Sequence, residues 1–571
     1  MGFQENFNRD DLTALFSSET GHIEVQLMRL PKARLLWLNH RVMHEDRAYA
    51  ECGATPEAYG QWLIDCCAYA IQPTNDDTLD LVSGICDRYG GAGIAHNGGS
   101  GRAAYIGGYH VKGIGRTPLV SVLTDDLHGT GGAYLEECVR EAICAEIVAI
   151  EFPAGAVPVL AIIETGEFQT WDTDQGPKTE RRCLLVRPGF VRPAHFERAP
   201  GFISADPKEG AKDAARVRKT WAAALTTCGR EQLLAAYPQF WHRWALQLAY
   251  GFVHRMAHGG HTSSNIALDG RLVDFGAMAA MPSWARISTM TGGAPVGMDM
   301  HFVMLALQTQ CQFWGRYLTP ELALSENTSS LWRSMGDTYQ EQTYVEALRV
   351  LGLSRSQSKE ILSSDFGSDV RRLLARLLGH FQREQFTIFD GTPEPHVKWD
   401  VTSIWLQSAP QHLQSLRDLL LKAMGPLTTT AEQVLVGRCR LRSLNREGLY
   451  REAAKEVVYE ALDGARKGAD LVPTLVASMI DEYIVRHRRD CETEPDNALP
   501  IGFAQNADGA FSLFFCLERK CYFAIREWQA GAIGGMEEVR LWVSGFDIHH
   551  ISFVENIEPK FIGSVFVNQI K

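Results

Sequence analysis

The segment YGGAGIAHNGGSGRAAYIGGYHVKGIG (residues 89–115) decides the predicted fold, because the other elements can be placed around it. Glycine is concentrated here between short apolar runs, which is typical of tight turns and of backbone that approaches another group closely. Lys112 falls in a short predicted strand near the end of the segment. Backbone N–H groups of such a loop can approach phosphates, and a lysine can neutralise them. A glycine-rich stretch alone is more often a cluster of turns, so the neighbouring elements must decide between the two interpretations.

The elements predicted after this segment follow the order of a protein-kinase core. Residues 131–150 have apolar side chains every four positions, which predicts one buried helical face. Glu141 on this helix could hold the lysine in place through an ion pair. Two apolar runs at residues 157–164 and 182–191 predict strands separated by a polar loop. A stripe of large apolar side chains then predicts a helix over residues 239–257.

A hairpin predicted after this helix completes the pattern. The segment NIALDGRLVDFG (residues 265–276) has two short apolar runs joined by an Asp-Gly pair, which is a strong hairpin-turn signal. A hairpin of this length brings Asn265 and Asp274 to the same end of the hairpin, at the mouth of the predicted nucleotide site. Their oxygens are hard ligands that Mg²⁺ accepts, and the ion would shield phosphate charge. Together with the lysine and the helical glutamate, the hairpin predicts a kinase-type nucleotide site.

Several motifs, in the same order, resemble those of the selenoprotein O family. The matching segments are YGGAGIAHNGGSGRA (residues 89–103), KGIGRTP (112–118), GGAYLEECVREAICAE (131–146), PGFVRPAHFE (188–197) and HGGHTSSN (258–265), followed by VDFG (273–276). The resemblance covers about 200 residues and fades after about residue 290. The last 140 or so residues have no counterpart that we recognise in the family.

The resemblance implies an α+β protein with a bilobal, protein-kinase-like (pseudokinase) core that binds ATP in a flipped orientation. Such a protein transfers AMP from ATP to hydroxyl groups of proteins or peptides. It further implies that Glu141 orients Lys112 and that Asn265 and Asp274 hold Mg²⁺ (or Mn²⁺). The positions that match the family's nucleotide contacts are Gly99, Gly101, Arg102, Lys112, Gly131 and Arg192, with Arg187 as a second phosphate arginine two residues out of register.

The chain departs from the family at three acidic positions around the nucleotide. Ser264 stands where the family has the aspartate proposed as the general base, and a serine hydroxyl cannot accept a proton near neutral pH without help. Ser100 and Thr130 replace two further acidic residues. His261 is a candidate substitute base, because the unperturbed pKa of histidine is near neutrality. Since the lysine, glutamate and metal-ligand positions remain, we expect nucleotide binding to be better preserved than transfer.

Three functions therefore remain open at the level of sequence. The first is an adenylyltransferase that modifies a protein or peptide, and the second is a kinase, which the literal Asp-Phe-Gly leaves open. The third is an ATP-binding pseudoenzyme that acts through a partner. A zinc site formed by His254, His258 and His261 is a further alternative. No cysteine or fourth ligand accompanies these histidines, which argues against zinc. The resemblance implies a structural role for His258, which matches a histidine of the family's catalytic loop.

Composition limits the partners. Of the 571 residues, 45% are hydrophobic and 22% charged, which is ordinary for a soluble protein of two or three domains. The formal net charge of -12 argues against nonspecific nucleic-acid binding. Thirteen scattered cysteines without a CxxC pair favour a reducing, cytoplasmic setting. The most apolar stretch, residues 145–163, is interrupted by charges and prolines, so we expect no membrane span.

Four regions are expected along the chain. We expect an N-terminal helical extension over residues 1–80 and a kinase-like N-lobe over residues 81–195. Residues 196–430 are expected to form a helical C-lobe with the catalytic loop and Asp-Phe-Gly. Residues 431–571 predict helices followed by a small β-rich unit. Its strand-like runs are FSLFFCLE, CYFAIREW, EVRLWVSG and HISFVEN. The sequence assigns no chemistry to the first and last regions.

Overall fold

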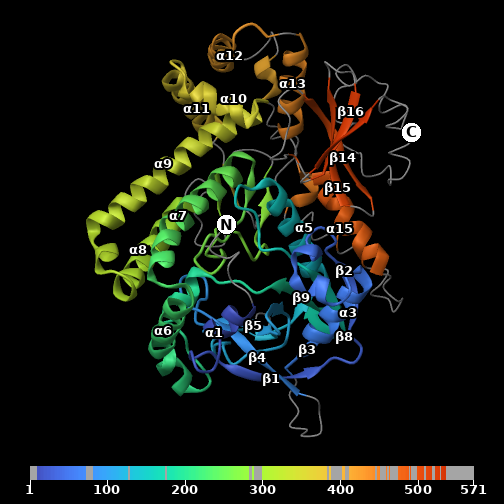
Figure 1. The fold of residues 1–571 in the computed structure, drawn as a ribbon, viewed down its shortest axis with the longest axis vertical. Coiled ribbons are helices and arrows are strands. Elements are labelled where there is room, and N and C mark those ends of the chain that lie inside the picture. Colours follow the sequence, from blue (N-terminus) through green and yellow to red (C-terminus); the bar gives the residue numbers. More distant parts are fainter. Residues whose placement is uncertain are drawn as a thin grey trace.

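The chain combines one large antiparallel sheet with many helices and a smaller antiparallel sheet (Figure 1). The computed structural model describes residues 9–71, 81–125, 129–173, 176–281, 286–288, 299–381, 385–387, 401–405, 411–427, 429–443, 446–450, 458, 462, 473–487, 489, 498–506, 509–516, 521–526 and 529–534. Mixed helical and sheet content, as expected from the sequence, is confirmed in these residues.

The large sheet places Lys112 in its interior. Its strands are β1 (Glu24–Arg29), β2 (Arg34–Leu38), β3 (Tyr69–Ala70), β4 (Leu81–Arg88), β5 (Gly99–Ile106), β6 (Tyr109–Lys112), β7 (Ala133–Tyr134), β8 (Ala161–Thr173) and β9 (Gly176–Pro188). Their hydrogen-bonded order is β2-β8-β9-β6-β5-β4-β1-β3, with β7 paired to β9, and every pair is antiparallel. All four residues of β6 are buried between β5 and β9. The lysine at the end of β6 is therefore fixed by strands on both sides.

The N-terminal region differs from the helical extension predicted for residues 1–80. It does contain the helices α1 (Arg9–Leu15), α2 (Arg47–Glu51) and α3 (Pro56–Cys67), but β1, β2 and β3 are also part of it. β1 pairs along β4, and β2 pairs with β8 over a run whose last three residues are buried. Pairing with distant strands satisfies the backbone of these short segments, so tertiary contacts override local helical preference.

The polar loop predicted between residues 164 and 182 is also replaced by strand. β8 and β9 continue through these residues as a ribbon, in register from Phe168 opposite Arg181 to Thr173 opposite Gly176. The Trp171 indole donates to Glu180 at 2.9 Å on the neighbouring strand. Such cross-strand pairs stabilise a ribbon that has little buried surface, which explains why a polar sequence forms strands here.

Helices follow the sheet in the described residues up to His487. They are α5 (Leu135–Glu151), α6 (Pro207–Cys228), α7 (Arg230–Val253), α8 (Asp299–Tyr317), α9 (Ser325–Val350), α10 (Arg355–Ser363), α11 (Gly367–Phe381), α12 (Gln411–Met424), α13 (Thr429–Ser443) and α15 (Pro473–His487). Short 3-10 helices are η2 (Met43–Glu45), η3 (Pro193–Phe196), η5 (Pro320–Ala323), η6 (Thr402–Trp405) and η7 (Glu447–Leu449). The two helices predicted over residues 131–150 and 239–257 are confirmed as α5 and α7, although α7 begins earlier and ends earlier.

The C-terminal sheet contains β14 (Ala498–Asn506), β15 (Gly509–Cys516), β16 (Cys521–Arg526) and β17 (Gln529–Gly534), joined as consecutive antiparallel pairs. In Figure 1 it lies beside α13 and α15. The runs EVRLWVSG and HISFVEN, predicted as strands, lie outside the described residues. Two short pairs complete the strands, β10 (Met256–Ala257) with β11 (Ala279–Ala280) and β12 (Arg286–Ser288) with β13 (Gln385–Thr387).

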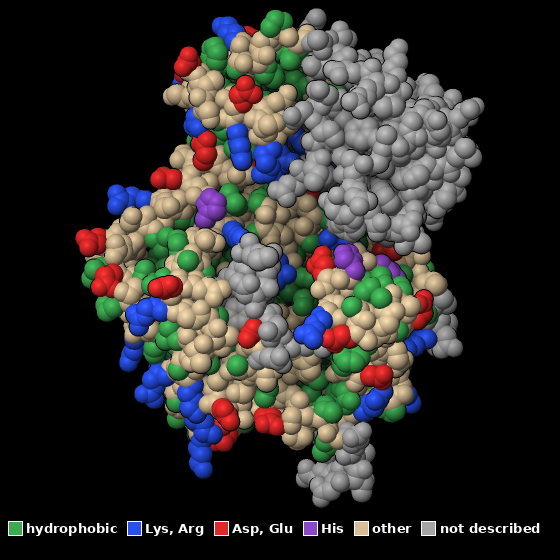
Figure 2. All heavy atoms as spheres, viewed as in Figure 1, with side chains coloured by type: hydrophobic (Ala, Val, Ile, Leu, Met, Phe, Trp, Pro, Cys, Tyr) green, Lys and Arg blue, Asp and Glu red, His purple; other side chains and the backbone are tan. Residues whose placement is uncertain are grey.

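The main hydrophobic core surrounds α5. It joins apolar side chains of this helix to those of α7, α8 and α15, with Trp221, Trp241 and Trp244 fully buried. On the face shown in Figure 2, basic and acidic side chains of the described residues are interspersed rather than separated by sign. No helix in the described part of the chain is both long and apolar enough to cross a membrane.

Candidate functional site

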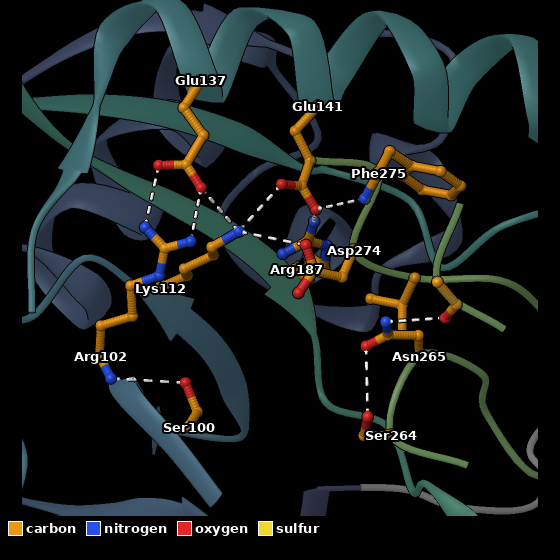
Figure 3. A network of polar contacts seen from close by, with 12 residues as sticks. Ser100, Arg102, Lys112, Glu137, Glu141, Arg187, Ser264, Asn265, Asp274 and Phe275 are labelled. Atoms are coloured by element: carbon orange, nitrogen blue, oxygen red, sulfur yellow. Dashed lines mark hydrogen bonds and ion pairs between the residues drawn. The ribbon is translucent and has the colours of Figure 1, made fainter. Parts of the chain in front are cut away.

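The site is centred on Lys112 (Figure 3). Its ammonium nitrogen Nζ lies 3.0 Å from Glu141 Oε2, 3.0 Å from Glu137 Oε1 and 3.7 Å from Asp274 Oδ1. Glu137 and Glu141 are one helical turn apart, so both project from the same face of α5 toward the strand that carries the lysine. Lys112 and Glu141, which the sequence predicts as partners, are thus brought together, and two further carboxylates join them.

Arginines extend this group of charges at both ends. Arg102 on β5 donates to both oxygens of Glu137, at 2.9 and 2.6 Å. Arg187 on β9 donates to Glu141 Oε1, which also accepts from the Phe275 backbone N–H at 3.2 Å. Three cations therefore lie among three carboxylates. The cations are Arg102, Lys112 and Arg187, and the carboxylates are Glu137, Glu141 and Asp274. Such a group is neutral as a whole although every member is charged.

Mutual attraction keeps these groups ionised. Burial and the Arg102 charge lower the pKa of Lys112, but the three carboxylates outweigh them and raise it above its ordinary value. Burial raises the pKa of Glu137, whereas Arg102 and Lys112 lower it to about 2. The Lys112 charge holds the pKa of Asp274 well below its usual range. The site therefore carries fixed charges at physiological pH.

The hairpin predicted after α7 holds the two candidate metal ligands. Ile266 and Leu272 form a bridge, and the Val273 backbone N–H donates to the Asn265 carbonyl at 3.1 Å. The Asn265 side-chain nitrogen donates to Gly260 O at 2.9 Å, which leaves Oδ1 as the atom that can bind a cation. The Asp274 side chain is 47% exposed. A carboxylate and an amide oxygen are hard donors that fit Mg²⁺ or Mn²⁺.

The Asp-Phe-Gly segment is set by an unusual backbone conformation. Asp274 has a φ of 66°, in the left-handed region that non-glycine residues seldom occupy. The next side chain, Phe275, is buried and meets the His258 ring edge to face, with centroids 5.5 Å apart. Burying the phenyl ring fixes where the preceding carboxylate points. A residue held in a sparsely populated conformation by its surroundings is typical of functional sites.

Ser264 and His261 are close in sequence but share no hydrogen bond in the structure. The Ser264 hydroxyl lies 2.7 Å from the Thr262 hydroxyl and donates to Asn265 Oδ1 at 3.5 Å. His261 Nδ1 accepts from the Trp244 indole at 3.3 Å. Burial, with a smaller contribution from His258, holds the pKa of His261 well below its usual range. His261 is therefore neutral near pH 7, and its buried ring would be a weak base.

The three histidines of the zinc alternative have separate partners. His254 pairs with Glu346, 2.8 Å from its Nε2, and His258 Nε2 lies 3.1 Å from the Val273 carbonyl. His261 is engaged by tryptophan, as described above. Within the described residues, no group of three or more His, Cys, Asp or Glu side chains could hold a metal ion. The structure gives the zinc alternative no support.

Arg192 connects the glycine-rich segment to the loop that carries Ser264. Its guanidinium lies 3.1 Å from Asp87 Oδ2, stacks on the rings of Tyr89 and Phe190, and donates to the Ser264 carbonyl. Asp87 is fully buried and also pairs with His110 and His195, at 3.0 and 2.8 Å. The sequence does not single out Asp87, because one aspartate before a glycine run carries no visible signal of burial.

Packing within the protein explains the glycines predicted to contact nucleotide. Gly131 has a φ of 73°, and a side chain there would meet the backbone of Gly115 and Arg116. A side chain at Gly99 would meet the backbone around Asp87, and one at Gly101 would meet Val120. These positions need glycine whether or not a nucleotide binds. Close approach of backbone, which the glycine content predicts, is confirmed.

The glycine-rich segment also packs against Glu197, which the sequence analysis does not identify. A side chain at Gly91 would meet both the Glu197 carboxylate and the Ser263 hydroxyl. Glu197 is 1% exposed and accepts from the Gln310 side chain, and no ion pair to its carboxylate is recorded in the described residues. Burial raises its pKa to about 7, although hydrogen bonds from Ser263 and Gln310 oppose this shift.

Glu197→Gln is expected to remove a pH dependence of stability. In the unfolded chain this carboxyl titrates near 4.5. Between that pH and 7, the unfolded chain loses a proton that the folded chain keeps, so the free energy of unfolding falls as pH rises. The free energy of unfolding of the variant, minus that of the natural chain, should therefore rise by about 2 to 3 kcal/mol between pH 5 and pH 8. Urea unfolding at both pH values measures this gain, and a constant difference between the two chains would contradict it.

A scan against models of protein families found no match to this chain, and a search among curated proteins likewise found none. The function must therefore be argued from the site itself.

Proposed function

We propose that the large sheet with α5 and the helices from α6 onward form a bilobal, kinase-like core that binds ATP with Mg²⁺ or Mn²⁺. The observation that carries this proposal is the position of the Lys112 ammonium, 3.0 Å from Glu141 and 3.7 Å from Asp274. In kinases, a strand lysine paired with a helix glutamate binds the nucleotide phosphates, and an Asp-Phe-Gly aspartate holds the metal. The resemblance to the selenoprotein O family supports the same assignment.

The residues around Lys112 would contact the phosphates and the metal ion of bound ATP. Lys112 binds phosphate oxygens, and Glu141 keeps the lysine extended across the site. Asn265 and Asp274 would hold the metal ion, which when bound shields the negative charge of the phosphates. Arg102 and Arg187 surround the lysine with further positive charge. Arg192, stacked beside the Ser264 loop, is the remaining candidate for a phosphate contact.

The reaction we propose is transfer of AMP to a hydroxyl group of a protein or peptide. The acceptor oxygen bonds to the α-phosphorus, the bond from this phosphorus to the bridging oxygen breaks, and pyrophosphate leaves. The hydroxyl proton must pass to a base, for which Ser264 is poorly suited. Positioning and charge neutralisation supply most of the catalysis in reactions of this kind, so transfer does not depend on the base alone.

Two alternatives have specific observations in their favour. The literal Asp-Phe-Gly at residues 274–276 is the sequence found in protein kinases, which transfer the terminal phosphate. The hydroxyl of Ser264 is hydrogen-bonded to that of Thr262 at 2.7 Å and stands where a general base is expected. This favours an ATP-binding pseudoenzyme without turnover. The scattered cysteines favour a cytoplasmic protein in each case. The experiment below distinguishes all three.

The purified full chain with Mg²⁺ is incubated with α- or γ-labelled ATP, beside Lys112→Ala and Asp274→Ala. We expect acceptor labelling from the α position alone, and its loss in both variants. Label from the γ position alone would show phosphotransfer instead. If neither label transfers while ATP still binds in a Lys112-dependent way, the pseudoenzyme is supported. If the natural chain binds no ATP, the proposed nucleotide site is wrong.

A further inference from the structure

The far end of α5 is tied to the C-terminal part of the chain. Glu151, the last residue of this helix, has a fully buried carboxylate. Arg446 donates to both of its oxygens, at 3.0 and 2.8 Å, and the Arg489 backbone N–H donates to it at 2.7 Å. The Tyr250 hydroxyl of α7 adds a hydrogen bond at 3.1 Å. Four donors from three separate parts of the chain thus converge on one carboxylate.

Apolar packing reinforces this connection. α15 packs directly against α5 and β2. Five buried side chains of α15 belong to the same hydrophobic core cluster as those of α5: Val476, Met479, Ile480, Tyr483 and Ile484. Figure 1 shows α15 beside α5, between the large sheet and the C-terminal sheet. The C-terminal region therefore packs against α5 as well as binding its end.

The same helix carries Glu141, ten residues before Glu151. An α-helix rises about 1.5 Å per residue, so the two residues are about 15 Å apart along the axis of one helix. We expect a shift of the Glu151 end to move Glu141 relative to Lys112, because α5 is one continuous helix without proline. The position of the equivalent helix is what controls the lysine–glutamate pair in kinases.

We propose that Arg446 is a positioning residue for the nucleotide site. Through Glu151 it holds α5 where Glu141 meets Lys112, so the C-terminal region acts as a built-in partner of this helix. The effect on ATP rests on the proposed function, but the effect on α5 itself does not. A merely stabilising ion pair would lower the stability of the whole fold without a particular effect on this helix.

The test compares Arg446→Met with Arg349→Met in the full chain. Arg349 and Glu346 form an equally buried ion pair within α9, with 2.9 Å between Arg349 Nη1 and Glu346 Oε2. Each substitution removes an arginine from a buried glutamate that keeps its other hydrogen-bond donors. Two quantities are measured: hydrogen exchange of residues 135–151 without nucleotide, and the Kd for Mg-ATP. Arg446→Met should speed exchange in α5 and raise the Kd about tenfold, within the usual range of coupling between sites. Arg349→Met should do neither.

Arg446→Lys provides a second variant in case the methionine substitution prevents folding. A lysine keeps the charge but not the paired geometry, so the changes in exchange and Kd should be intermediate. Equal effects of the Arg446 and Arg349 variants on α5 exchange, or no effect of either Arg446 variant, would overturn the proposal. If the natural chain binds no ATP but Arg446→Met still speeds exchange in α5, the proposed function fails while the positioning of α5 stands.

Discussion

Replacing Glu141 with glutamine is expected to lower the free energy of unfolding by about 3 to 5 kcal/mol, as found when a buried ion pair loses one partner. Glu141 accepts from the Arg187 guanidinium, and both side chains are 1% exposed. The variant would remove the carboxylate to which this buried guanidinium donates. Lys112 would keep Glu137 but lose its second glutamate. Because a misplacement of about 1 Å can cost about 10²-fold in rate, transfer of label from ATP should fall by about that factor.

Glu137→Gln is the matched control, since it lies one turn away on the same face of α5. Its carboxylate is 18% exposed and its partner Arg102 is 33% exposed, so water can compensate for part of the loss. Because Glu137 also contacts Lys112, we expect a decrease of about 1 to 3 kcal/mol, between the values for exposed and buried ion pairs. Urea unfolding and ATP titration of both variants measure the difference. Equal losses of stability and affinity in the two variants would show that Glu141 has no special role.

Ser264→Asp is expected to raise the rate of the proposed AMP transfer by about 10² to 10⁴-fold, the usual contribution of a positioned general base. Ser264 lies beside Asn265, and its hydroxyl is 2.7 Å from that of Thr262. A carboxylate at this position could accept the proton of the acceptor hydroxyl, which a serine hydroxyl cannot do near pH 7. Labelling of an acceptor from α-labelled ATP measures the rate.

Ser264→Asn separates basicity from shape in this experiment. Asparagine has the same size as aspartate but cannot take up a proton, so its rate should remain near that of the natural chain. An equal increase for both substitutions would mean that the side chain acts by its size. If Ser264→Asp leaves the rate unchanged while ATP remains bound, the missing carboxylate is not what limits this site.

Much of the site could be predicted because its residues have recognisable spacings. Lys112 follows a glycine-rich segment, Glu141 lies on an amphipathic helix, and Asn265 and Asp274 flank a hairpin, so each has a local signal. Glu137 could have been found by the same reasoning, since it lies four residues before Glu141. Each of these residues belongs to an element whose periodicity fixes where its side chain points.

Other parts of the site depend on contacts that no local pattern encodes. The buried carboxylates of Asp87 and Glu197 are set by residues more than twenty positions away, such as His110 and Gln310. In the fold, β1 and β2 were missed for the same reason. They become strands by pairing with β4 and β8, and short segments of this kind take their structure from their neighbours.

The contacts of Glu151 can form only late in translation, because their other partners lie far along the chain. This residue is made 295 residues before Arg446 and 338 residues before Arg489. At about 5 to 20 residues per second, translation leaves α5 without these donors for roughly 15 to 70 s. A nascent chain thus carries Lys112 and Glu141 well before the contacts that hold their helix exist. Products of premature termination before residue 446 lack those contacts permanently, so they would show whether α5 can hold Glu141 in place without them.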